Sequence, residues 1–125
     1  MLSHVSLGTN DAERAAAFYD PVLAVLGIGK GKRRGGSVDY SAAMVGFSLE
    51  QPVDGQPASV GNGVHVCFVA KNRAQVDEFY RVALAHGGSD AGAPGMRPEY
   101  DAHYYGAFVR DPDGNKIEAV CFMAK

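Results

Sequence analysis

The stretch HVSLGTNDAERAAAFYDPVLAVLG (residues 4–27) aligns without a gap with HVCFVAKNRAQVDEFYRVALAHGG (residues 65–88). The identical pairs are His4 and His65, Val5 and Val66, Phe18 and Phe79, Tyr19 and Tyr80, Leu23 and Leu84, Ala24 and Ala85, and Gly27 and Gly88. Self-similarity at a fixed offset is typical of a duplicated structural unit. The repeat therefore predicts two tandem copies of one module.

Each copy opens with a short strand. In an extended segment, successive side chains point to opposite faces. In GVHVCFVA (63–70) the two faces are Val64, Val66 and Phe68 on one side and His65, Cys67 and Val69 on the other. The first face is apolar and suits the core, so His65 is predicted to lie on the opposite face.

A helix is expected to follow each opening strand. Asn10 with Glu13, and Asn72 with Gln75, form capping-box patterns ahead of apolar residues at helical spacing. Pro21 is predicted to kink or restart the first helix because proline lacks a backbone N–H. The two glycines at 87–88 are predicted to end the second helix.

The rest of each copy indicates short strands. Residues 37–52 are predicted to hold two strands joined near 42–46, with a weaker strand in the basic, glycine-rich segment before them. HYYGAFVR and NKIEAVCF flank the turn sequence DPDG (111–114), which predicts a hairpin. The segment before residue 95 is interpreted as a Gly/Ala/Pro-rich loop. The prediction is an α+β fold of two βαβββ modules in one domain (1–125), with module 1 at 1–52, a linker at 53–61 and module 2 at 62–125.

Composition limits the function classes. The chain has 125 residues, with 12 Lys and Arg against 14 Asp and Glu and a net charge of −2. Nucleic acid and membrane are therefore not expected as partners. Cys67 and Cys121 show no metal-binding spacing. With no signal-peptide pattern at the N-terminus, a cytoplasmic location is expected.

The duplicated module, with HVSL and FY in the first half, HV and FY in the second, and the closing DPDGNKIEAV, resembles the vicinal oxygen chelate superfamily. This superfamily includes glyoxalase I, extradiol dioxygenases, fosfomycin resistance enzymes and bleomycin-binding resistance proteins. The resemblance covers essentially the whole chain. It implies that the two modules form an open, curled sheet, a cup with helices outside, whose concave face carries a divalent metal.

The resemblance also implies a ligand set. The family's ligands lie on the first and last strands of each module, which points to His4, His65 and Glu118. Two imidazoles and one carboxylate suit Fe, Mn, Zn or Ni. Alignment of the last strands places Ser48 where a four-ligand site would have a carboxylate, and Glu50 would replace it only after a two-residue shift. The alternative is that both histidines are structural, inherited together from one ancestral module.

The segment GMRPEYDAHYYGAF (95–108) concentrates titratable and aromatic groups beyond the needs of a simple connection. A position lining the cup is expected for this segment. The catalytic candidates are His103, Tyr105 and Glu118, and the substrate-binding candidates are Arg97, Tyr100, Tyr104, Ser48 and Glu50. His103 would transfer a proton and a tyrosine would hydrogen-bond a substrate oxygen. Because Tyr104 and Tyr105 are adjacent in an expected strand, at least one is expected to serve packing only.

The leading functional hypothesis is a small metal-dependent enzyme that acts on a small substrate with adjacent oxygens. Its reaction, whether isomerase or lyase, dioxygenase or transferase, stays open. The alternative is a metal-free protein that binds or sequesters a small, antibiotic-like molecule, as bleomycin resistance proteins do. By the same resemblance, a homodimer is expected, with the possibility that modules are exchanged between chains.

Overall fold

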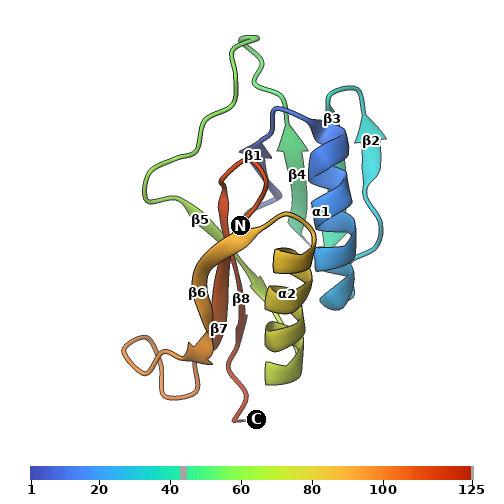
Figure 1. Cartoon of the computed structure of the whole chain (residues 1–125). Coiled ribbons are helices and arrows are strands. Elements are labelled where there is room, and N and C mark those ends of the chain that lie inside the picture. Colours follow the sequence, from blue (N-terminus) through green and yellow to red (C-terminus); the bar gives the residue numbers. More distant parts are fainter. Residues whose placement is uncertain (43–44, 125) are drawn as a thin grey trace.

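The computed structural model describes residues 1–42 and 45–124 and shows the two βαβββ modules that the repeat predicts (Figure 1). Module 1 contains β1 (His4–Gly8), α1 (Ala12–Val25), β2 (Lys32–Arg34), β3 (Ser37–Ala42) and β4 (Val45–Glu50). Module 2 contains β5 (His65–Val69), α2 (Arg73–Ala85), β6 (Ser89–Met96), β7 (Tyr105–Arg110) and β8 (Lys116–Cys121). The fold class is α+β, as predicted. The turn expected between β3 and β4 includes residues 43–44, which lie outside the described residues.

Each module forms its own four-stranded sheet. The strand order is β1-β4-β3-β2 in the first sheet and β5-β8-β7-β6 in the second. The first and last strands of each module run parallel, and the remaining pairs are antiparallel. The equivalent topologies show that the two copies of the repeat adopt one architecture.

The strand registers define equivalent positions in the two modules. Ser6 pairs with Ser48 in module 1, and Cys67 pairs with Glu118 in module 2. Ser6 and Cys67 each follow a repeat histidine by two residues, so Ser48 and Glu118 occupy equivalent positions. This confirms the alignment of the two last strands that was made from the sequence.

The structure differs from two expectations about α1, its N-cap and a restart at Pro21. Its N-cap is Asp11, whose side chain accepts a hydrogen bond from the Arg14 N–H at 3.0 Å. Asn10 instead binds the backbone of Ala58 in the segment between the modules, at 2.7 and 3.2 Å. The helix also continues through Pro21 to Val25. Its inner face packs on the core on both sides of the proline, so the loss of one backbone donor does not interrupt it.

The prediction for α2 is confirmed. The Asn72 side chain caps the helix by accepting from the Gln75 N–H at 2.9 Å. The helix ends at Ala85, shortly before Gly87, whose φ of +100° is a conformation that glycine adopts without steric cost.

The segment interpreted as a Gly/Ala/Pro-rich loop is a strand. Residues 89–96 form β6, which pairs with β7 through a ladder interrupted by register shifts on both sides of Gly92. Backbone pairing with β7 determines this strand despite its poor β propensity. The DPDG hairpin is confirmed, because the Gly114 N–H donates to the Asp111 carbonyl at 2.9 Å.

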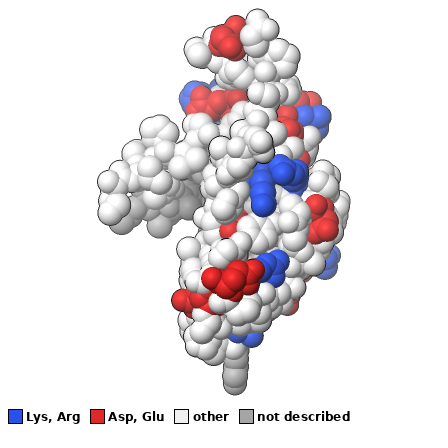
Figure 2. Space-filling model, turned by 90° about the vertical axis from the view of Figure 1, so that its left-hand side faces the viewer, with Lys and Arg blue, Asp and Glu red and all other residues white. Residues whose placement is uncertain are grey.

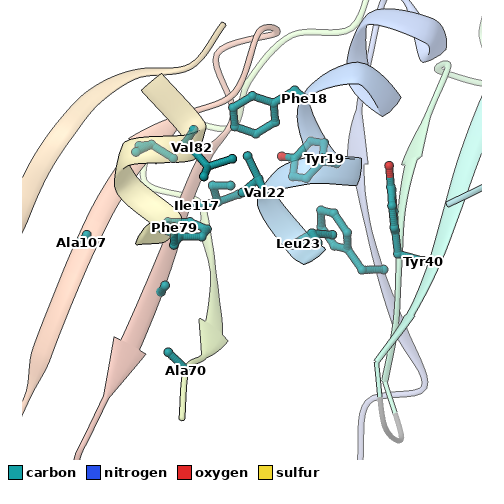
Figure 3. Packing of buried hydrophobic residues seen from close by; sticks show 14 of the residues in the cluster. Phe18, Tyr19, Val22, Leu23, Tyr40, Ala70, Phe79, Val82, Ala107 and Ile117 are labelled. Atoms are coloured by element: carbon teal, nitrogen blue, oxygen red, sulfur yellow. The ribbon is translucent and has the colours of Figure 1, made fainter. Parts of the chain in front are cut away.

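The helices hold the two modules together. α1 packs against α2, while α1 covers β3 and β4 and α2 covers β6, β7 and β8 (Figure 1). Phe18 and Phe79, equivalent in the repeat, are fully buried in this shared core (Figure 3). Ile117, Ala119 and Cys121 join the same core, so their neighbours on alternate positions of β8 point to the other face. No helix of the described residues is long and apolar enough to span a membrane.

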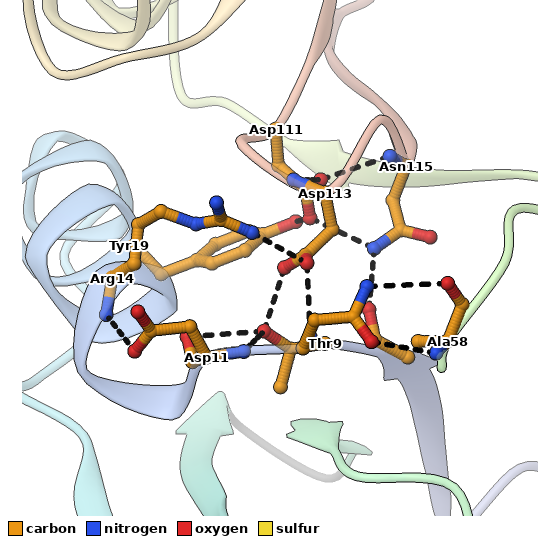
Figure 4. A network of polar contacts seen from close by, with 10 residues as sticks. Thr9, Asp11, Arg14, Tyr19, Ala58, Asp111, Asp113 and Asn115 are labelled. Atoms are coloured by element: carbon orange, nitrogen blue, oxygen red, sulfur yellow. Dashed lines mark hydrogen bonds and ion pairs between the residues drawn. The ribbon is translucent and has the colours of Figure 1, made fainter. Parts of the chain in front are cut away.

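The turn between β7 and β8 joins module 2 to module 1 through a network of polar contacts (Figure 4). Asp113 accepts hydrogen bonds from the Thr9 hydroxyl at 2.6 Å and the Asn10 N–H at 2.9 Å, and forms an ion pair with Arg14 at 2.8 Å. Behind it, the buried Asp111 accepts a hydrogen bond from the Tyr19 hydroxyl at 2.6 Å. The DPDGN motif therefore has a structural role in joining the modules.

Candidate functional site

A pocket of about 630 Å³ lies on the sheet of module 2, on the face turned away from α2. Its lining combines one carboxylate, one imidazole, two cations and three aromatic rings. The lining residues are His65, Ala91, Gly92, Arg97, Tyr100, Tyr104, Phe108, Lys116 and Glu118. This combination of polar groups in a concave surface is typical of a small-molecule site.

Glu118 is the buried centre of this pocket. Its side chain is only 1% exposed, and its Oε1 lies 3.1 Å from Nε2 of His65, which is 41% exposed. The Tyr104 hydroxyl donates a hydrogen bond to Oε2. A side chain at Gly106 would place its Cβ 2.9 Å from Oε2, so glycine leaves the space that this carboxylate occupies. A buried carboxylate is costly unless it is paired, and this one is paired on both oxygens.

The neighbouring acids are held in their protonated forms. Desolvation raises the pKa of the Cys67 thiol, and the charge of Glu118 raises it further. Burial and the hydrogen bond to Glu118 likewise raise the pKa of Tyr104. Near neutral pH, Cys67 is therefore a thiol rather than a thiolate nucleophile, and Tyr104 is a hydroxyl donor.

The equivalent face of module 1 carries a different, self-contained network. Ser48 lies 3.0 Å from the Ser6 hydroxyl and donates to Glu50 at 2.9 Å. Arg34 forms ion pairs with Asp39 at 2.8 Å and with Glu50 at 3.4 Å. The hydrogen bond from Ser48 contributes most to a lowered pKa of Glu50. Neither Ser48 nor Glu50 lines the pocket of Glu118, so the structure does not bring these two substrate-binding candidates to it.

The three predicted metal ligands do not meet within one chain. Among residues 1–42 and 45–124, no three His, Cys, Asp or Glu side chains are grouped so that they could hold one metal ion. His65 and Glu118 are in contact. His4, however, is exposed, and its Nδ1 lies 3.0 Å from the Ser3 hydroxyl. The physical reason is that β1 and β5 are outer strands of two separate sheets. Within one chain, the structure therefore brings His65 and Glu118 together but not His4.

Two catalytic candidates also lie outside the pocket. The Tyr105 hydroxyl donates to Asp77 of α2 at 2.6 Å, so Tyr105 faces the helix while Tyr104 faces the pocket. Alternation along β7 explains the difference, so the structure does not bring Tyr105 to the pocket. His103 is exposed in the β6–β7 connection and does not line the pocket. Its backbone N–H donates to the Asp101 side chain at 2.9 Å.

Three predicted substrate-binding residues, Arg97, Tyr100 and Tyr104, line the pocket together with the predicted ligands His65 and Glu118. Sequence reasoning missed Phe108 and Lys116. A signal for both existed: Lys116 precedes Glu118 by two residues on one strand, and Phe108 is the β7 residue paired with Glu118. Alternation would have found Lys116, whereas Phe108 required the register of the hairpin.

The family is decided by comparison with known proteins. The sequence model that describes the Glyoxalase/Bleomycin resistance protein/Dioxygenase superfamily matches residues 1–119 of this chain. The chain belongs to this superfamily. Its members bind small-molecule substrates, often use divalent metals and are commonly dimeric.

Solved structures agree with this assignment. A glyoxalase/bleomycin resistance protein from Albidiferax ferrireducens T118 is 40% identical, with a TM-score of 0.90 over 97% of this chain and 98% of that chain. A lactoylglutathione lyase from Agrobacterium tumefaciens is 23% identical, with a TM-score of 0.69 over 97% and 92% of the two chains. A superfamily enzyme from Burkholderia phytofirmans PsJN is 19% identical, with a TM-score of 0.75 over 97% and 98%. These last two show the shared fold alone. No curated protein matches the sequence.

Proposed function

We propose that the pocket around Glu118 is the active site of a metal-dependent enzyme that acts on a small substrate with adjacent oxygens. The observation that carries this proposal is the contact of 3.1 Å between the imidazole of His65 and the buried carboxylate of Glu118. The reaction class, isomerase or lyase, dioxygenase or transferase, is left open by these residues.

The donor set fits a divalent metal. An imidazole and a carboxylate are both ligands of Zn, Mn, Fe and Ni, and here they come from adjacent parallel strands. A carboxylate that is 1% exposed is expensive to keep charged, and a cation would offset that cost. We propose His65 and Glu118 as two of its ligands.

The chain's own residues have separable roles in this proposal. Tyr104 fixes the orientation of Glu118 through its hydrogen bond to Oε2. Tyr100 packs edge-on against Tyr104, with ring centroids 5.0 Å apart, and forms an aromatic wall for a substrate. The metal, when bound, would supply Lewis-acid chemistry to substrate oxygens.

We propose that a second copy of the chain supplies His4 as the third ligand. β1 and β5 are outer strands of their sheets within the described residues, and a largely apolar groove of about 830 Å³ runs between them. Val64, just before β5, and Val69, the last residue of β5, are 54% and 73% exposed. A homodimer that brings module 1 of one copy to module 2 of the other would cover this apolar surface and complete the ligand set.

His65→Ala and His4→Ala are each expected to abolish divalent metal binding in calorimetric titration with Zn²⁺ or Mn²⁺. Both side chains are exposed at the surface of a strand, so the folded state should survive, as circular dichroism would show. An equimolar mixture of the two variants, unfolded and refolded together, should regain part of the sites, because one of the two cups in each mixed dimer has both histidines.

His103→Ala is the matched control for these variants, since His103 is exposed and lies outside the pocket. It should bind metal as the parent does. Light scattering should give the mass of a dimer for all four proteins. A monomeric parent, or a mixture that regains no sites while each variant stays dimeric, would contradict the shared cup. If His65→Ala binds metal like the parent, His65 is a structural histidine.

A specific observation supports the second candidate, a metal-free protein that binds a small molecule. The side chains of Tyr104 and His65 provide a hydrogen-bond partner for each oxygen of Glu118. Elemental analysis of protein purified without chelators separates the two candidates. Stoichiometric metal in the parent and none in Glu118→Gln supports the enzyme, whereas a parent that neither retains nor takes up metal supports the binding protein.

A further inference from the structure

Two cationic side chains, those of Arg97 and Lys116, line the Glu118 pocket and lie near the ring of Phe108. Lys116 places its Nζ 4.9 Å from the centroid of the Phe108 ring, and Arg97 places its Cζ 5.6 Å from the same centroid. Both residues are half-buried, and both line the pocket together with His65 and Glu118. Placing two like charges around one ring is unfavourable unless something offsets their repulsion.

Nothing in the described part of the chain offsets it by ion pairing. Arg14, Arg34 and Arg81 each form an ion pair with a carboxylate, whereas Arg97 and Lys116 form none among the described residues. Among residues 1–42 and 45–124, Glu118 is the only carboxylate that lines the pocket, and its two oxygens are bound by His65 and Tyr104. The two cations are therefore available to a ligand.

A backbone carbonyl of β6 holds the side chain of Arg97. Its Nη2 donates to the Ala93 carbonyl at 2.9 Å. A Cβ added at Gly95 would come within 3.0 Å of Nη1, and one at Gly92 within 3.4 Å of Nη2. Gly92 and Gly95 of the irregular strand β6 thus leave room beside the guanidinium.

The equivalent face of module 1 lacks this excess charge. The register places Lys116 opposite His65, and the residue opposite His4 is Gly46. The arginine on the module 1 face, Arg34, is neutralised by Asp39 and Glu50. Figure 2 shows one face of the molecule, on which Lys and Arg side chains gather near the middle, while Asp and Glu side chains lie lower with a Lys or Arg side chain beside them. The unpaired cations are a feature of module 2 and not of the duplicated scaffold.

We infer that Arg97 and Lys116 bind an oxyanion, a carboxylate or phosphoryl group, on the small molecule that the pocket accepts. Arginine presents paired N–H donors that match such a group, and lysine adds a point charge. Tyr100, Tyr104 and Phe108 supply aromatic walls for the body of the ligand. This inference deepens the proposed function by assigning the charge of the substrate, and it uses the same pocket.

The test uses the full chain in the presence of a chelator, so that metal plays no part. Benzoate, phenyl phosphate and the neutral benzyl alcohol are titrated separately, and binding is followed by amide chemical shifts in NMR. Both anions, or one of them, should bind more tightly than benzyl alcohol and shift amides around Phe108. The affinity for the anion should fall as sodium chloride is raised. The stronger anion identifies the group as carboxylate or phosphoryl.

Lys116→Met and Arg97→Gln should each weaken binding of the preferred anion by about tenfold or more, as for loss of one charge-assisted contact. Lys71→Met, which removes an exposed lysine outside the pocket, is the matched control and should bind as the parent does. Equal binding of anions and benzyl alcohol, no binding of either anion, or unchanged affinity in Lys116→Met and Arg97→Gln would overturn the inference. Because a chelator is present, loss of metal binding and loss of anion binding are separate results.

Discussion

Replacing Asp111 by alanine is expected to lower the free energy of unfolding by about 3 kcal/mol, because the change removes the shared acceptor of several buried donors. The carboxylate accepts from the Tyr19 hydroxyl at 2.6 Å and from the Asn115 backbone N–H and side-chain amide at 2.8 and 3.0 Å. Burial raises the pKa of Asp111, so the cost of its desolvation already offsets part of the gain from these bonds. In thermal unfolding, the midpoint should fall by about 10 °C.

Asp54→Ala is the control for this prediction. The Asp54 side chain is exposed and, within the described part of the chain, accepts only from the nearby Gln56 backbone N–H, at 3.0 Å. Its loss should therefore change stability by no more than about 0.5 kcal/mol. Equal midpoints for Asp111→Ala and the parent would show that the turn does not hold the modules together.

Glu118→Gln is expected to weaken divalent metal binding by about 100-fold or more, while the free energy of unfolding stays the same or rises. The amide has the shape of the carboxylate, and it can exchange hydrogen bonds with both Tyr104 and His65. It lacks the charge that holds a cation, and it removes a buried charge from the core of the pocket. Calorimetric titration with Mn²⁺ or Zn²⁺ measures the first effect, and urea unfolding measures the second.

Glu50→Gln is the matched control, since Glu50 belongs to the module 1 network with Ser48 and Arg34. It should leave metal affinity unchanged. If Glu50→Gln loses metal and Glu118→Gln does not, the ligand lies in module 1 and the assignment of Glu118 is wrong. If both variants bind as the parent does, neither carboxylate is a ligand.

The repeat made the fold predictable, because apolar positions on α1, α2 and β8 recur with clear periodicity. β6 was missed because its pairing with β7 is set by a partner strand and not by the residues of 89–96, which have low β propensity. The cap of α1 was misplaced by one residue, since Asn10 and Asp11 are both good caps and only the contact of Asn10 with Ala58 decides between them.

The site was predictable where strand alternation alone decides it. The period of two was enough to place His65 on the face opposite the core and Glu118 on one face of its strand, whereas their closeness was implied by the family resemblance. Placing His4 beside them required knowledge of how two sheets meet, which no local pattern contains. The neighbouring pair Tyr104 and Tyr105 illustrates the same limit, because alternation predicts that they diverge and only the contact with Asp77 shows which one faces α2.

Anomalous diffraction from crystals grown with Mn²⁺ or Zn²⁺ measures whether His65 and Glu118 bind a divalent cation. We expect an anomalous peak bonded to Nε2 of His65 and to the Glu118 carboxylate, with His4 of a second copy completing the ligand set. A metal-saturated crystal without a peak at this pair, in which His65 and Glu118 remain hydrogen-bonded to each other, would contradict this expectation.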